Sequence, residues 1–300
     1  MDKRNIRKTT MVTISGRPNV GKSTLLNALV GEKVAIVTNK PQTTRNRILA
    51  VLNRGYTQFV FIDTPGYHTP KNRLGNYMVK VIRESVADVD AVILMVEPIP
   101  NIGDQEHHLI QWIAKNNVPG VLVVNKIDTV RKEELLSVID LYREAHTFDA
   151  IVPISAKQGD GLEQLIAVLD RYALEGPQLF PDDMITDQPE RQIVAEIIRE
   201  KLLLCLQKEI PHGTAVEVTK FSERDDGIID VEATIYVEKP SHKGMVIGKH
   251  GTMLRQVGEL ARKDIERFMG TKVYLETWVK VKERWRDSAY LLRNFGYTSE

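Results

Sequence analysis

Cysteine is almost absent from this 300-residue chain, which has one, Cys205. A single cysteine excludes an internal disulfide framework and is typical of a reducing cytosol. Cys205 lies in the apolar run 202–206, so we expect buried packing rather than a nucleophilic role. No apolar stretch approaches the roughly 20 residues of a membrane-spanning helix. Residues 1–4 carry no apolar segment, so no signal peptide is expected and a cytoplasmic location is predicted.

Repeats, low-complexity tracts and a large net charge are also missing. The net charge is +1, so the charge of the whole chain indicates no partner. Apolar residues make up 42% and charged residues 27%, which is ordinary for a globular protein. Three hundred residues predict about two domains.

Apolar runs alternate with amphipathic helical patterns in the first part of the chain. This alternation predicts an α/β fold with a doubly wound, mostly parallel sheet. We expect strands near 10–15, 47–53, 57–62, 91–96, 120–125 and 150–154, and helices near 23–30, 72–87, 104–116, 131–146 and 161–173. The polar motifs described next all follow predicted strands, at the edge where such sheets bind ligands.

The stretch 16–23 matches the phosphate-loop pattern G-x-x-x-x-G-K-[ST]. The apolar run 11–14 precedes it and the helical pattern 24–30 follows, as such a loop requires. The glycines let backbone N–H groups face phosphate, and the helix N-terminus adds positive potential. We expect Lys22 to reach the β- and γ-phosphates and Ser23 to bind Mg²⁺. The predicted nucleotide-binding residues here are Gly16, Arg17, Pro18, Asn19, Val20, Gly21, Lys22, Ser23 and Thr24.

A second motif, Asp63-Thr64-Pro65-Gly66, follows the apolar run 59–62. Alone it would indicate an ordinary turn, but its distance downstream of Lys22 favours a nucleotide site. A carboxylate at the end of a buried strand lies beside the ligand crevice, so Asp63 is a candidate Mg²⁺ anchor. The Gly66 N–H is a candidate contact of the γ-phosphate.

The polar segment 39–45 lies between these two motifs and is typical of a switch loop. A threonine hydroxyl in it would complete the Mg²⁺ shell, and we favour Thr44 over Thr43. The predicted metal ligands are therefore Ser23, Thr44 and Asp63. The residues predicted to act in catalysis are Lys22, Thr44 and Gly66.

Two further motifs indicate the base. Asn125-Lys126-Ile127-Asp128 follows the apolar run 120–124, and Ser155-Ala156-Lys157 follows 151–154. The Asp128 carboxylate can accept from both N1–H and the N2 amine of guanine, whereas adenine would leave it unpaired at a cost of roughly 1–3 kcal/mol. We expect Asn125 to tie this loop to the phosphate loop, the Lys126 stem to cover the base, and the Ala156 N–H to meet guanine O6. The ligand is thus predicted to be GTP or GDP.

The pattern changes after residue 176. Residues 177–189 contain three prolines and three aspartates, which indicates a linker between domains 1–176 and 190–300. Its apolar side chains predict that it is docked rather than free. From 190 the element order is predicted to be α-β-β-α-α-β-α.

The stretch 246–251 joins two predicted helices and contains the Gly-x-x-Gly of a KH module, although a bare Gly-x-x-Gly is often only a tight turn. The window 239–286 holds twelve Lys/Arg and five Asp/Glu, so the basic charge is local. Trp278 and Trp285 could stack on bases or cover the core. We expect single-stranded RNA as the ligand. The predicted RNA-binding residues are Val246, Ile247, Gly248, Lys249, His250, Gly251 and Arg255.

These motifs together resemble the Era family of bacterial GTPases over essentially the whole chain. The resemblance rests on the phosphate loop, Gln42-Thr43-Thr44-Arg45, the Asp63 and Asn125 motifs, and a single following KH module. It implies a type II KH domain that binds the single-stranded 3′ end of 16S ribosomal RNA, and a role in assembling the small (30S) ribosomal subunit. It also implies a monomer in the cytoplasm, partly attached to the inner face of the cell membrane.

Two positions bear on the mechanism that the resemblance implies. Tyr67 occupies the place where Ras-like GTPases carry a water-orienting Gln, so intrinsic hydrolysis should be slow. Asn19 resembles a residue that helps to place K⁺ in related GTPases. Tyr67 also keeps open an alternative, an RNA- and membrane-docking scaffold in which GTP hydrolysis is incidental. A P-loop kinase is not supported, because the motif at 125–128 would have no role in one.

Overall fold

The computed structural model describes residues 7–40, 42–66, 70, 72–85, 89–207 and 210–297. By their contacts, the described residues form two compact units. The first unit takes the described residues within 1–35, 44–68 and 78–187, and the second takes those within 36–43, 69–77 and 188–300. The second unit therefore takes up two short segments from within the first, which the predicted boundaries along the chain did not include.

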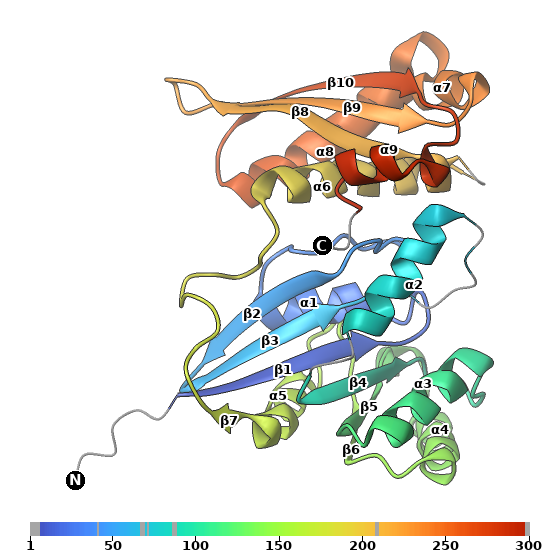
Figure 1. Cartoon of the computed structure of the whole chain (residues 1–300), viewed down its shortest axis with the longest axis vertical. Helices are drawn as coiled ribbons and strands as arrows, with labels where there is room; N and C mark the ends of the chain where they lie inside the picture. The colour runs from blue at the N-terminus through green and yellow to red at the C-terminus, as the bar shows by residue number, and fades with distance from the viewer. Residues whose placement is uncertain are drawn as a thin grey trace. The chain divides into compact units, whose positions relative to one another are not determined.

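A seven-stranded sheet forms the centre of the first unit as described (Figure 1). Its order is β2-β3-β1-β4-β5-β6, with β7 paired to the start of β1. The pairs β2–β3 and β1–β7 are antiparallel, and the pairs β3–β1, β1–β4, β4–β5 and β5–β6 are parallel. The strands are β1 Lys8–Ser15, β2 Ile48–Arg54, β3 Thr57–Asp63, β4 Ala91–Val96, β5 Gly120–Val124, β6 Ala150–Pro153 and β7 Leu174–Glu175. The predicted mostly parallel sheet is confirmed.

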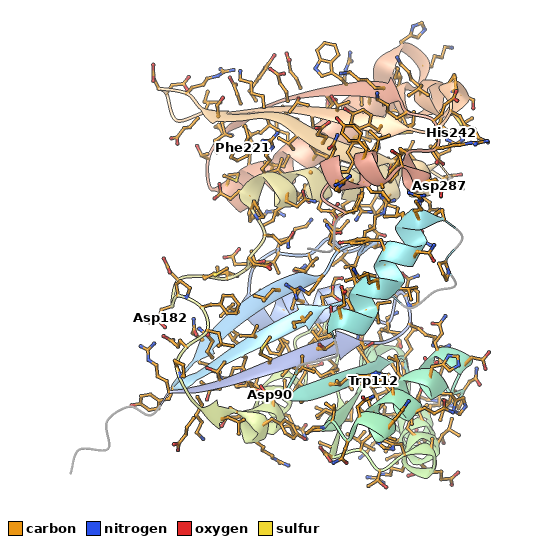
Figure 2. The ribbon with its side chains drawn as sticks, in the orientation of Figure 1. Asp90, Trp112, Asp182, Phe221, His242 and Asp287 are labelled. Carbon is orange, nitrogen blue, oxygen red and sulfur yellow. The ribbon has the colours of Figure 1, made fainter. Side chains whose placement is uncertain are left out.

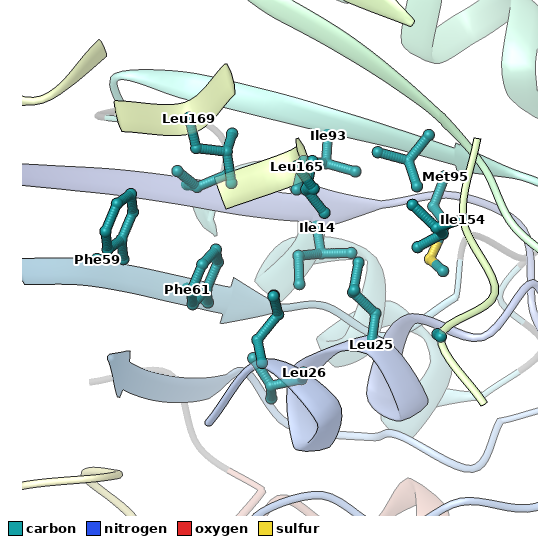
Figure 3. Close-up of a cluster of buried hydrophobic side chains, with 14 of the residues drawn as sticks. Ile14, Leu25, Leu26, Phe59, Phe61, Ile93, Met95, Ile154, Leu165 and Leu169 are labelled. Atoms are coloured by element: carbon teal, nitrogen blue, oxygen red, sulfur yellow. The ribbon is translucent and has the colours of Figure 1, made fainter. Parts of the chain in front are cut away.

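Helices lie on both faces of this sheet because successive strand residues point to opposite sides. On one face Ile93 and Met95 share a core with α1 and α5; on the other, Leu94 and Val96 pack with α3 and α4 (Figure 3 shows the first core). The helices are α1 Lys22–Val30, α2 Arg73–Ser85, α3 Asp104–Asn116, α4 Lys132–Ala145 and α5 Leu162–Leu169. The helix predicted to reach 173 ends at 169, and a 3₁₀ turn over Asp170–Tyr172 follows before β7.

The linker is docked on the first unit, as its apolar residues predicted. Phe180 packs against Leu49, Val51 and Val60, and its backbone N–H donates to Gln58 Oε1 at 3.0 Å. Further along, the Val51 N–H donates to the Ile185 carbonyl at 2.8 Å. Asn53 Nδ2 donates to the carbonyl of Asp182 at 2.9 Å; Asp182 is marked in Figure 2. These bonds hold the linker along β2 and the Gln58 side chain of β3.

The second unit has the predicted order α-β-β-α-α-β-α. Its elements are α6 Glu190–Cys205, β8 Ala215–Glu223, β9 Ile229–Val237, α7 Pro240–Ile247, α8 Thr252–Met269, β10 Val273–Val281 and α9 Ala289–Asn294. The sheet order is β10-β9-β8, with β9 and β10 parallel and β8 and β9 antiparallel. Helices α6 and α8 share the apolar core with one face of the sheet, and Cys205 packs partly buried against that core.

Three consecutive charged residues of α6 are buried inside the second unit: Arg199, Glu200 and Lys201. Burial of charge is costly unless each group finds partners. Lys201 pairs with Asp264 of α8, Arg199 donates to the Thr43 carbonyl, and Glu200 Oε1 accepts from the Val37 N–H at 2.9 Å. The charged stretch therefore holds the described part of 36–43 against α6.

Candidate functional sites

The phosphate loop lies between β1 and α1, at the carboxyl end of the sheet. Gly16 has φ +153°, and a Cβ there would stand 2.3 Å from the Met95 carbonyl oxygen. Gly21 has φ +105°, and a Cβ there would stand 2.3 Å from the Asn125 side-chain nitrogen. Both positions need glycine, because the loop passes directly over the ends of β4 and β5. The pattern match at 16–23 is thus a close-packed turn of the required kind.

Lys22 begins α1 and its side chain is buried beneath the loop. Its ammonium donates to the carbonyls of Gly16 at 3.0 Å and Arg17 at 2.9 Å. Burial lowers the pKa of Lys22 to about 8, and the opposing charge of Asp63 limits the fall. A buried ammonium held by two carbonyls is poised to exchange those bonds for anionic oxygens.

The three predicted metal ligands converge. Ser23 Oγ donates to Asp63 Oδ2 at 2.6 Å and lies 2.9 Å from Thr44 Oγ1. Asp63 is fully buried, and burial raises its pKa to about 6, against the effects of Lys22 and Ser23. Its second oxygen, Oδ1, is buried with no hydrogen-bond partner. Two hydroxyls and a carboxylate with a spare buried oxygen match the hard oxygen ligands that Mg²⁺ prefers, so these residues fit that ion.

Thr43 and Thr44 are separated clearly by the structure. The Thr44 hydroxyl contacts Ser23, whereas the Thr43 hydroxyl donates to the Lys40 carbonyl at 2.7 Å and contacts Thr38. The preference for Thr44 therefore agrees with the geometry. Pro41, within the same predicted switch loop, lies outside the described residues.

The Asp63 motif lies against the phosphate loop. A Cβ at Gly66 would stand 2.8 Å from the Pro18 ring, so only glycine allows this approach. The Thr64 hydroxyl donates to the Ile14 carbonyl at 3.1 Å, which anchors the motif to β1. Tyr67, on which the expectation of slow hydrolysis rests, lies outside the described residues.

Asn125 ties three loops together. Its Nδ2 donates to the Val20 carbonyl at 2.7 Å, as predicted, and its Oδ1 accepts from the Ala156 N–H at 2.9 Å. The Ala156 N–H, for which a contact with guanine O6 was predicted, thus bonds to Asn125 in this structure, because the Asn125 carboxamide reaches both loops. This buried side chain therefore helps to position both base loops.

Asp128 follows in a 3₁₀ turn, Ile127–Thr129, and is exposed. Its Oδ1 accepts from the Ser155 hydroxyl at 2.6 Å, which fixes the carboxylate. Lys126 has φ +65° and donates to the Asn19 carbonyl at 2.9 Å, so its stem spans from the base loop to the phosphate loop. Lys157 is exposed beside them.

Two carboxylates that the sequence did not indicate border this site. Glu97, just after β4, pairs with Lys126, and Glu106, in the first turn of α3, pairs with Arg17. The only sequence signal was their position downstream of a strand that ends at the site. A glutamate at the start of a helix is otherwise an ordinary first-turn residue.

The Gly-x-x-Gly loop lies in the second unit between α7 and α8. His250 has φ +53°, and a Cβ at Gly248 would stand 2.7 Å from Met253 Cβ, so the loop is a tight left-handed connection. Lys249 and His250 are exposed, as their predicted contact with RNA requires. Val246, however, is fully buried in the core, so its predicted contact with bases is wrong: α7 turns that side chain inward. Ile247 is partly buried on the same core.

A cavity of about 360 Å³ adjoins this loop along α8. It is lined by Gly251, Leu254, Arg255, Gly258, Glu259, Arg262, Leu275 and Thr277. Arg255 was predicted as part of the RNA site, whereas the β10 residues and Gly258 were not. A glycine inside a helix is the sequence signal that could have found this cavity. Glycine lowers helix stability, so its presence there indicates a need for space. Trp278 is 57% exposed and Trp285 is buried, where its Nε1 donates to the Gly213 carbonyl at 2.9 Å.

A sheet with these four motifs at its carboxyl edge, followed by a KH unit, defines a GTPase with an attached KH domain. Residues 11–126 match the 50S ribosome-binding GTPase family, and residues 209–286 match the KH domain family. The chain is 50% identical over 290 residues to GTPase Era of Ruminiclostridium cellulolyticum, covering 97% of both chains. It is 50% identical over 295 residues to GTPase Era of Clostridioides difficile, covering 98% of this chain and 99% of that one.

Solved structures agree with this classification. A crystal structure of Era with MgGDPNP and nucleotides 1506–1542 of 16S ribosomal RNA is 38% identical, with a TM-score of 0.93, and covers 98% of this chain and 100% of that chain. A variant of Aquifex aeolicus Era bound to GDP and AlF₄⁻ is also 38% identical with a TM-score of 0.93, covering 97% of this chain and 100% of that chain. The chain belongs to the Era family of GTPases and is an enzyme that hydrolyses GTP.

Proposed function

We propose that the residues described above form the GTP site of this enzyme, with guanine at the 125–128 and 155–157 loops and the triphosphate over residues 16–23. The observation that carries this assignment is the convergence of Ser23, Thr44 and Asp63 next to the phosphate loop. Ser23, Thr44 and Asp63 would hold Mg²⁺. When bound, that ion neutralises charge between the β- and γ-phosphates.

The protein's own groups act by positioning and by charge. The Lys22 ammonium and the loop N–H groups stabilise the negative charge that develops on the phosphates. The Gly66 N–H, held against Pro18, contacts the γ-phosphate. The sequence offers no Gln after Gly66 to orient water, so hydrolysis by the isolated protein is slow. Asn19 of the phosphate loop would help to place K⁺. A turnover assay in which Na⁺ replaces K⁺ tests this role.

The base assignment is tested by Asp128→Asn. The amide keeps the shape of the side chain but offers only one acceptor where guanine presents two donors. We expect GTP affinity to fall by roughly 10- to 100-fold, while ATP affinity does not fall, as follows from a lost charged hydrogen-bond pair. Fluorescent-nucleotide titration measures both, and an unchanged preference for GTP would refute the assignment.

The second unit is proposed to bind the single-stranded 3′ end of 16S ribosomal RNA. Support comes from the Gly-x-x-Gly geometry, the adjoining cavity with Arg255 and Arg262, and the RNA in the related Era crystal structure. We propose that this binding assists assembly of the 30S subunit, and that the protein is a cytoplasmic monomer. The described residues include no helix with the length and apolarity to cross a membrane. We further propose peripheral contact with an anionic membrane surface through basic residues of the second unit.

A docking scaffold with incidental hydrolysis is the competing function. The two are separated by measuring GTP turnover with and without an oligonucleotide of the 16S 3′ end. Stimulation supports the switch, and the absence of stimulation by both the oligonucleotide and 30S subunits supports the scaffold.

A further inference from the structure

One short segment after β4 reaches both nucleotide-contacting loops of the first unit. It runs from Glu97 to Glu106, between the end of the strand and the first turn of α3. Each end carries a carboxylate, and each carboxylate meets a cation of a different loop: Lys126 of the base loop and Arg17 of the phosphate loop.

The contact at Glu97 joins the segment after β4 to the base loop and, through Lys126, to the phosphate loop. Lys126 Nζ lies on the Glu97 carboxylate and also donates to the Asn19 carbonyl at 2.9 Å. The Lys126 and Glu97 side chains are 37% and 27% exposed, so the pair is partly shielded from water. A lysine stem fixed at its ammonium end loses little further freedom when a base packs on it.

The second contact is buried on its Glu106 side. One carboxylate oxygen of Glu106 accepts from the Gly103 N–H at 3.2 Å, and the other meets the Arg17 guanidinium. The Glu106 side chain is 0% exposed and that of Arg17 is 28% exposed. The Arg17 carbonyl is itself an acceptor of Lys22 at 2.9 Å, so this ion pair fixes the backbone group that holds the phosphate-binding lysine.

We propose that Glu97 and Glu106 are positioning residues of the GTPase, which hold Lys126 and Arg17 and thereby preorganise the base loop and the phosphate loop for nucleotide. This inference rests on the proposed GTP site. Neither carboxylate is placed to touch the reacting atoms. Their effect is therefore expected in nucleotide affinity rather than in the chemical step.

The test for Glu97 is a double-mutant cycle with Lys126 in the full-length protein, using Glu97→Gln, Lys126→Met and the double variant. We expect Glu97→Gln to weaken binding of both GTP and GDP by about 5- to 20-fold, as for loss of one partly buried charged partner. The kcat at saturating GTP and the preference for guanine over adenine stay within about twofold, since Asp128 and Lys22 are untouched.

The double variant decides how Glu97 acts. If Glu97 works through Lys126, the double variant binds GDP no more weakly than Lys126→Met alone. Independent, additive losses, or unchanged affinity in Glu97→Gln, would overturn the proposal for this carboxylate. Glu163→Gln is the control, because Glu163 is an exposed carboxylate that also pairs with a cation, Arg54, away from the site.

The same cycle with Arg17→Met and Glu106→Gln tests the second carboxylate. Glu106→Gln keeps the bond to the Gly103 N–H and removes only the charge, and its unfolding temperature is measured beside its affinity. The proposal expects GDP affinity to follow the charge at position 106 rather than the unfolding temperature. Glu106→Asp, which restores the charge, should therefore bind GDP more tightly than Glu106→Gln. If affinity instead follows the unfolding temperature across these variants, Glu106 is only structural and the proposal fails for it. Failure of the GTP site itself looks different, because Lys126→Met and Asp128→Asn would then leave guanine-nucleotide binding unchanged.

Discussion

At the scale of single residues, two buried charges dominate the nucleotide site. Lys22 and Asp63 carry opposite charges, and each favours the ionised form of the other. Burial nevertheless lowers the pKa of Lys22 to about 8 and raises the pKa of Asp63 to about 6. Both groups must be ionised to perform their proposed roles. Both groups are therefore ionised together mainly at pH values between the two pKa values in the free protein.

This shared ionisation predicts a bell-shaped pH profile. The kcat/KM for GTP reports the free enzyme, so it should rise as pH increases through about 6, when Asp63 loses its proton, and fall through about 8, when Lys22 loses its own. Steady-state turnover from pH 5 to 9.5 measures both limbs. Nucleotide binding with and without Mg²⁺ is the control, because the phosphates titrate in both arms whereas only the Mg²⁺ arm needs the Asp63 carboxylate. A flat profile across pH 5–7 would contradict the assigned role of Asp63.

At the scale of elements, function follows from where strands and helices end. Glycines at 16, 21 and 66 stand where a loop passes against a carbonyl, a carboxamide or a proline ring. Helix α8 shows a different use: a Cβ at Gly258 would meet nothing within 4 Å, yet the residue lines the cavity beside the Gly-x-x-Gly loop. The glycine keeps that cavity open at the expense of helix stability.

Gly258 gives a prediction that separates folding from binding. Gly258→Ala should raise the free energy of unfolding by up to about 1 kcal/mol, since alanine is the better helix former. Gly258→Leu should also fold, but its side chain should fill the cavity. We therefore expect it to weaken binding of the 16S 3′-end oligonucleotide by at least about 10-fold, as a blocked subsite does. Thermal unfolding and fluorescence anisotropy measure the two effects. Equal RNA affinity in Gly258→Leu would mean that RNA does not enter this cavity.

At the scale of the whole molecule, adjacent residues of the switch segment have partners in different units. The Thr43 carbonyl accepts from Arg199 within the second unit, and the Thr44 hydroxyl contacts Ser23 within the first. A ligand that binds the Thr44 hydroxyl therefore acts on a segment whose preceding residues, 36–43, belong to the second unit.

This continuity predicts coupling between the two ligands. RNA should bind more tightly to protein loaded with a non-hydrolysable GTP analogue than with GDP, by roughly 5- to 100-fold, and linkage requires RNA to raise affinity for the analogue by the same factor. Two titrations, one in each direction, check the reciprocity. Arg199→Lys keeps a positive charge but loses the planar donor geometry at Thr43, so it should reduce the coupling. Glu163→Gln should leave it unchanged, and equal RNA affinity in both nucleotide states would contradict the prediction.

The sequence by itself determined the element order, the sheet type and the chain positions of the phosphate loop and of the residues proposed to bind Mg²⁺ and guanine. These depend on local patterns: periodicity sets strands and helices, and short motifs carry glycines and polar groups at the spacing that one loop needs. Only the tertiary structure decided that Val246 turns inward, that the Ala156 N–H meets Asn125, that Trp285 is buried while Trp278 is not, and that Glu97 and Glu106 face Lys126 and Arg17. Each of these depends on which residues distant in the chain become neighbours, and such pairings are set by the packing of whole elements rather than by any local run of residues.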